Sequence, residues 1–196
     1  MNYQIYKDAR RAAWDFLIEN CVCALPLSFS EICTRCGISI FRDSAGVYLE
    51  KGQHGATFLR GGRFNILVSG SDSLEVQRLT IAHELGHIYM RHPTAESQLG
   101  RTFGICRKPV SPEEYQAERF AVSVLAPACV LRELEAWSAQ EIAEICRIPL
   151  EAARLRADRM RTLRKRDAFF SDPLEIRVYQ QFRQFFREMR GRRSEK

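Results

Sequence analysis

The stretch Ala82-His83-Glu84-Leu85-Gly86-His87 contains two histidines four residues apart, with a glutamate directly after the first. On an α-helix, residues i and i+4 lie on one face, so His83 and His87 can both point an imidazole nitrogen at one metal ion. Glu84 lies roughly a quarter turn round the helix from His83 and can serve as a general base without binding the metal. The spacing therefore predicts a catalytic zinc site with His83 and His87 as ligands and Glu84 as the base.

The helix expected around this motif, residues 73–91, is apolar on two sides. Its N-cap is expected at Asp72, with Glu75 three residues further on. A stripe opposite the histidines is formed by Leu74, Ile81, Leu85 and Ile88. Buried imidazoles and carboxylates need partners. Two hydrogen-bonded core histidines would also meet that need, but the spacing of the pair with a glutamate between them favours a metal site. Gly86 costs about 1 kcal/mol relative to alanine inside a helix, so we expect another element to approach closely there.

A catalytic zinc needs a third protein ligand. The candidates are His54, His92, Glu96, Glu113, Glu114 and Glu118. On the helix expected over 112–125, Glu114 is in phase with the small residues Ala117 and Ala121, which would let two helices approach. Glu114 is also the third residue after Ser111, where a capping box places a glutamate without any metal. Helical phase favours Glu114, and Glu118 is the alternative.

Few strands are expected, and they lie between helical blocks. Alternating patterns predict strands at 38–41, 56–60 and 63–69, and Gly61-Gly62 between the last two is typical of a β-hairpin. Helical patterns occupy most of the remaining chain. This arrangement predicts an α+β fold in which a small antiparallel sheet packs on the motif helix.

Positive charge is concentrated in the last quarter of the chain. Residues 1–149 contain 16 Lys+Arg and 17 Asp+Glu, a balance of −1, whereas residues 150–196 contain 14 and 7, a balance of +7. We therefore divide the chain into a catalytic segment, 1–130, and a helical, basic segment, 131–196. Within the second segment, residues 138–165 resemble a helix-turn-helix.

This basic helix pair raises an alternative function, a DNA-binding or repressor-binding regulator whose zinc site is structural or vestigial. The arginines of the second helix spread around it rather than forming one stripe, which argues against DNA contact; they are Arg154, Arg156, Arg159, Arg161 and Arg164. Glu84 argues against a protein that only binds, since such a protein has no use for a base beside the metal.

Composition argues against several classes. Hydrophobic residues make up 45% and charged residues 28% of the 196 positions, as in soluble globular proteins. No apolar stretch approaches the ~20 residues of a membrane helix, and the N-terminus lacks the apolar core of a secretory signal, so we expect a cytoplasmic protein without membrane contact. Seven cysteines, an odd number, argue against a disulfide framework. A second zinc site is a less favoured alternative to ordinary packing for Cys21, Cys23, Cys33 and Cys36.

Two segments resemble the ImmA/IrrE family of zinc metallopeptidases: Arg78–His87, and Glu114–Ala121 followed by Leu125-Ala-Pro127. The strand Phe64–Ser69 ahead of the motif helix also matches. In the family, the first glutamate of the second motif is the third ligand, which implies Glu114 here. Gln116 stands where the family has Glu or Gln, so one alternative carboxylate is removed. The resemblance implies a zincin-like fold that holds one zinc ion.

The same resemblance implies a function. Members look like site-specific endopeptidases that cut helix-turn-helix repressors of mobile elements, phages or stress operons, which derepresses the target gene. We therefore expect a zinc-dependent endopeptidase with such a protein as its substrate. An extended substrate is expected to pair by β-augmentation with the strand made of Phe64, Asn65, Ile66, Leu67, Val68 and Ser69. The side chain that assists the oxyanion stays open among His54, Tyr89 and Tyr115.

Overall fold

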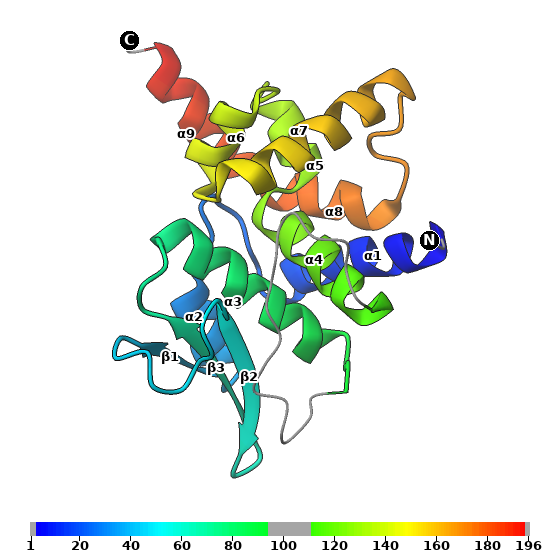
Figure 1. Ribbon diagram of the computed structural model, residues 1–196. Coiled ribbons are helices and arrows are strands. Elements are labelled where there is room, and N and C mark those ends of the chain that lie inside the picture. Colours follow the sequence, from blue (N-terminus) through cyan, green and yellow to red (C-terminus); the bar gives the residue numbers. More distant parts are fainter. Residues whose placement is uncertain (1–2, 94–110, 195–196) are drawn as a thin grey trace.

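The computed structural model describes residues 3–93 and 111–194. In chain order its elements are α1 (Tyr3–Glu19), α2 (Phe29–Arg35), β1 (Ser39–Asp43), β2 (Gly55–Arg60), β3 (Arg63–Ser69), α3 (Leu74–Tyr89), α4 (Pro112–Leu125), α5 (Ala128–Glu133), α6 (Ala139–Cys146), α7 (Leu150–Lys165), α8 (Pro173–Gln181) and α9 (Arg183–Ser194). The sheet lies at one end, α3 and α4 cross the middle, and α5 to α9 form the opposite end (Figure 1). The α+β class is confirmed.

The sheet has the strand order β1-β3-β2. β2 and β3 form the expected hairpin, with Ala56 opposite Leu67. β1 pairs parallel to β3, with Ser39 beside Asn65. The sheet is therefore mixed, and the prediction of a wholly antiparallel sheet is wrong. Side-chain alternation within a strand is the same for either direction, so the pattern at 38–41 contained no information about its partner.

β3 is the central strand, which changes the expectation for substrate binding. Its residues Asn65–Val68 pair with β1 on one side and with β2 on the other. Their backbone N–H and C=O groups are therefore used within the sheet and cannot accept a further strand. This corrects the expected substrate strand of Phe64, Asn65, Ile66, Leu67, Val68 and Ser69. Among the described residues, β2 pairs with β3 alone and forms an edge of the sheet.

Helix α3 lies between the sheet and α4, and its approach to α4 is unusually close. A methyl group in place of the Gly86 hydrogen would lie 3.1 Å from Ala117 Cα, 3.1 Å from Phe120 Cδ1 and 3.3 Å from the Ala117 carbonyl oxygen. The close approach expected at Gly86 is thus confirmed, and the partner is α4. Ala117 and Ala121 on α4 are both fully buried, as their small size requires at this crossing.

We predict that Gly86→Ala destabilises the protein, although alanine favours a helix by about 1 kcal/mol. The added methyl group would push the α4 backbone away, and overpacking of this kind costs about 1–3 kcal/mol. Urea unfolding should show a lower midpoint for Gly86→Ala. Gly191→Ala is the matched control, since nothing lies within 4 Å of a methyl group at Gly191. A Gly86→Ala variant as stable as the wild type would contradict the tight crossing.

The second half of the chain shares its hydrophobic core with the first. One cluster of buried side chains includes Leu17, Phe120, Ile142, Met160 and Phe182. It thus joins the predicted segments 1–130 and 131–196, and residue 130 lies inside α5. Among the described residues, no helix combines the length and the apolar character needed to cross a membrane.

The predicted helix pair at 138–165 is present as α6 and α7, and its arginines are partly used inside the molecule. Arg156 is buried and donates a hydrogen bond of 2.8 Å to the carbonyl oxygen of Val122. The guanidinium of Arg159 lies 4.8 Å from the ring centroid of Tyr6 on α1, and that of Arg164 lies 4.9 Å from the ring centroid of Trp137, before α6. Three of the arginines of α7 therefore have contacts within the molecule.

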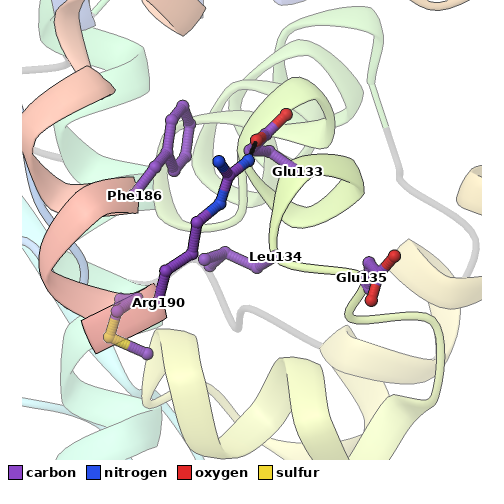
Figure 2. Close-up of a pocket in the computed structure, with 6 residues that line it drawn as sticks. Glu133, Leu134, Glu135, Phe186 and Arg190 are labelled. Carbon is purple, nitrogen blue, oxygen red and sulfur yellow. Dashed lines mark hydrogen bonds and ion pairs between the residues drawn. The ribbon is translucent and has the colours of Figure 1, made fainter. Parts of the chain in front are cut away.

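The carboxylate of Glu133, on α5, connects α5 to the last helix, α9. Glu133 accepts a hydrogen bond of 3.0 Å from the Tyr179 hydroxyl and forms an ion pair with Arg190 of α9, beside the buried ring of Phe186 (Figure 2). The cavity beside this ion pair has a volume of about 220 Å³ and is lined by Glu133, Leu134, Glu135, Phe186, Met189 and Arg190. It is smaller than the roughly 300–1,000 Å³ usual for a ligand pocket.

Asp43, at the end of β1, organises the loop that leads to β2. Its carboxylate accepts hydrogen bonds from the backbone amides of Val47 (3.0 Å), Tyr48 (2.9 Å) and Leu49 (3.0 Å). Burial acts to raise the pKa of Asp43, but these hydrogen bonds favour the ionised form and lower the pKa below its usual value. The carboxylate therefore stabilises the folded state only while it is ionised.

This depressed pKa predicts how Asp43 contributes to stability as pH changes. Its contribution is present above the unfolded-state pKa of about 3.9 and is lost as pH falls through the lower folded-state value. Asp43→Asn should therefore lower the free energy of unfolding at pH 7, and the gap to the wild type should narrow below about pH 4. Urea unfolding of both proteins at pH values from 7 to 3 measures this difference in unfolding free energy. A difference that stays constant with pH would contradict a lowered pKa of Asp43.

Candidate metal centre

Serine caps fix the start of both helices that contain candidate ligands. Ser73 caps α3 by accepting a hydrogen bond of 3.3 Å from the amide three residues on, and Ser111 caps α4 by accepting one of 3.2 Å from the Glu114 amide. The N-cap expected at Asp72 is therefore one residue too early. The Asp72 carboxylate instead lies 2.8 Å from His54 Nδ1.

The three predicted ligands meet at one point. The Nε2 atoms of His83 and His87 are 3.0 Å apart. The two carboxylate oxygens of Glu114 lie 3.3 Å from His83 Nε2 and 3.6 Å from His87 Nε2. Both histidines are buried, with exposed fractions of 3% and 8%. Two imidazoles one turn apart on α3 and a half-buried carboxylate from α4 thus form a single polar cluster.

The spacing of these atoms fits a divalent cation. Ligand atoms 2.0–2.2 Å from a tetrahedral zinc ion lie about 3.3 Å from one another, and the observed separations scatter around that value. Two imidazoles and one carboxylate are also a ligand set of catalytic zinc sites, with a fourth position left for water or substrate. Among residues 3–93 and 111–194, this is the one group of histidine, cysteine and acidic side chains that converges in this way.

Glu84 is held from the sheet side. The hydroxyl of Thr57, on β2, donates a hydrogen bond of 2.7 Å to Glu84 Oε2. Because Thr57 is on the edge strand and Glu84 directly follows the candidate ligand His83, this hydrogen bond joins the sheet edge to the cluster of candidate ligands. Thr57 was not predicted; a threonine in an alternating strand is indistinguishable from one that only fills a β-position.

The other ligand candidates among the described residues do not belong to the cluster. His54 is paired with Asp72, and Glu113 contributes no atom to it. Glu118 lies one turn beyond Glu114 with its carboxylate 3.6 Å from Arg119 Nη2; burial raises the pKa of Glu118, opposed by Arg119 and His83. Glu96 lies outside the described residues.

His92 lies beside a ligand rather than among the ligands. Its Nδ1 is 3.1 Å from Nδ1 of His87, on the side of that ring opposite the cluster. Burial lowers the pKa of His92 and outweighs its hydrogen bond to Gln116, which acts in the other direction. Helical periodicity did not reveal this contact, because the chain leaves the helix between His87 and His92.

Tyr89, one of the three candidates to assist the oxyanion, contacts α1. Its hydroxyl donates a hydrogen bond of 2.7 Å to Glu19 of α1, and its ring meets Phe16 edge-on at 5.5 Å. Burial and this hydrogen bond raise the pKa of Tyr89. Tyr89 thus faces α1. The ring of Tyr115 lies 4.9 Å below the guanidinium of Arg119, and His54 is engaged by Asp72.

The cysteines form no second cluster in the described part of the chain. Cys21, Cys23 and Cys36 are exposed, whereas Cys33 is buried, and burial raises the pKa of the Cys33 thiol to about 12. Cys33 therefore packs as a small apolar side chain, in agreement with the prediction of ordinary packing rather than a second zinc site.

Comparison with known proteins agrees with this geometry. Residues 33–158 match the peptidase family described as the IrrE N-terminal-like domain, and the chain belongs to that family. The match includes both ligand helices, the sheet and α6 with the first half of α7. No curated protein matches the chain closely enough to be reported as a relative.

We predict that Glu114→Gln lowers zinc affinity by more than about 100-fold, since losing a ligand should cost more than losing a hydrogen-bonding partner of a ligand. The matched control is Glu118→Gln on the same helix, which should bind zinc as the wild type does. Competition with a fluorescent chelator measures both affinities. Equal loss in the two variants, or loss in Glu118→Gln alone, would contradict Glu114 as the third ligand.

Proposed function

We propose that this protein is a zinc-dependent endopeptidase. The observation that supports the proposal most directly is the convergence of His83, His87 and Glu114 beside a carboxylate, Glu84, that lies next to the cluster but outside it. A structural zinc site needs four protein ligands and no base, whereas a hydrolytic one needs three ligands and a base. Membership of a peptidase family supports the same conclusion.

In the proposed mechanism Glu84 transfers the proton, and neighbouring residues hold the metal ion and orient the Glu84 carboxylate. A zinc ion held by the three ligands supplies polarisation of the scissile carbonyl and a lowered pKa of water. Glu84 accepts a proton from the attacking water and donates it to the leaving amine. Thr57 holds one oxygen of the Glu84 carboxylate through the 2.7 Å hydrogen bond and so orients the base.

The edge strand β2 is the proposed docking site for an extended substrate. Its outer backbone groups have no strand partner among the described residues, and its Thr57 contacts the base. A peptide added to this edge by β-augmentation would run past Glu84 and the ligand cluster. This assignment replaces β3, whose two sides are already paired.

The proposed substrate is a helix-turn-helix transcriptional repressor of a mobile element, phage or stress operon, in the cytoplasm. Support for this class comes from the family resemblance of the two motifs, and the site itself supports only the cleavage of an extended peptide segment. A repressor encoded beside this protein is the first substrate to test.

We predict that Glu84→Gln binds zinc as the wild type does but cleaves the repressor at least about 100-fold more slowly, since general acid–base catalysis contributes 10²–10⁴-fold. The repressor encoded by the neighbouring reading frame is incubated with each protein, with and without chelator, and products are identified by mass spectrometry. Turnover by Glu84→Gln at the wild-type rate would remove Glu84 as the base.

Two variants of Thr57 distinguish the effect of misorienting the Glu84 carboxylate from the effect of removing it. Thr57→Val removes the hydrogen bond to Glu84 but keeps the carboxylate, so its cleavage rate should lie between those of the wild type and Glu84→Gln. Thr57→Ser keeps a hydroxyl and should restore most of the rate. If chelator leaves wild-type cleavage unchanged, the reaction does not depend on the metal and the proposal fails.

A further inference from the structure

His92 is brought back over the end of α3 by the way that helix stops. Arg91 has a left-handed backbone conformation, with φ of 55°. The amide of His92 donates a hydrogen bond of 2.9 Å to the carbonyl oxygen of His87, and that of Arg91 donates one of 3.1 Å to Ile88. These two hydrogen bonds form a Schellman motif, which reverses the chain direction. The His92 ring therefore meets the His87 ring edge-on at a centroid distance of 5.0 Å.

The two rings and one amide form a chain of contacts that links both ligand helices. His92 Nδ1 lies 3.1 Å from His87 Nδ1, and His92 Nε2 lies 3.1 Å from Oε1 of Gln116 on α4. Gln116 is two residues after the ligand Glu114. The contacts thus run from a ligand on α3, through His92, to the helix that supplies the third ligand.

The protons of this chain can be assigned from the ligand geometry, and this step rests on the proposed zinc site. His87 Nε2 faces the other ligands, so it presents a lone pair to a bound cation. A neutral imidazole then has its proton on Nδ1, and His87 Nδ1–H donates to His92 Nδ1. His92 in turn has its proton on Nε2 and donates it to the Gln116 oxygen. Each contact then has one donor and one acceptor.

We propose that His92 is a positioning residue for the metal centre. It accepts the Nδ1 proton of His87, which fixes the tautomer and the ring plane in which His87 Nε2 points at the cluster, and Gln116 fixes the tautomer of His92. Histidine ligands commonly donate their second N–H to such a partner, and losing the partner typically lowers metal affinity 10- to 100-fold.

The first test is zinc affinity, measured by chelator competition without any substrate. His92→Phe keeps a ring but removes the acceptor, and it should weaken zinc binding 10- to 100-fold. His92→Asn places a carbonyl oxygen near the former Nδ1 position and should recover most of that loss. Gln116→Leu should weaken binding by a smaller factor. Wild-type affinity in His92→Phe would overturn the proposal, as would an equal loss in His92→Phe and His92→Asn.

The second test reads the tautomers directly and does not depend on any variant folding. Two-bond ¹H–¹⁵N correlation spectra of the zinc-loaded wild type should show His87 protonated at Nδ1 and His92 protonated at Nε2. His92 protonated at Nδ1, or at both nitrogens, would overturn the relay. If the wild type binds no zinc at all, the proposed peptidase function fails as well, whereas a zinc-binding wild type with the wrong tautomers removes only this inference.

Discussion

The close crossing of α3 and α4 at Gly86 is the contact on which the candidate metal centre depends. Gly86 is adjacent to the candidate ligand His87, and its partner Ala117 is three residues after the candidate ligand Glu114. A carboxylate from one helix reaches imidazoles on another only if the two backbones approach closely, and a larger side chain at either position would separate them. The unfavourable helix propensity of Gly86 is thus the cost of bringing Glu114 within 3.3–3.6 Å of the histidine nitrogens.

The sheet adds a second constraint from the opposite side of α3. Because β2 is at an edge, the hydroxyl of Thr57 reaches Glu84 while the outer backbone groups of the strand stay outside the sheet. The candidate ligands are therefore positioned by helix–helix packing, and the proposed base is positioned by strand–helix packing. This separation explains how one motif of five residues can present candidate ligands and a proposed base in different directions.

The basic C-terminal helices are built into the same core as the site. Arg156 is buried against α4 through its hydrogen bond to Val122, so α7 helps to hold the helix that contains Glu114. Arg159 and Arg164 cover aromatic rings of other elements. The basic helix α7, which the sequence suggested as a possible nucleic-acid surface, thus helps to position α4.

The sequence alone determined the parts of this protein that depend on local spacing. The i, i+4 histidines, the glutamate between them, the hairpin at Gly61-Gly62 and the in-phase Glu114 follow from helix and strand periodicity, and the structure brings His83, His87 and Glu114 together as expected. The parallel direction of β1, the central place of β3 and the contacts of Thr57 and His92 were decided only by tertiary structure. Periodicity states which face a residue occupies, but strand partners and contacts beyond a helix end depend on how distant segments pack.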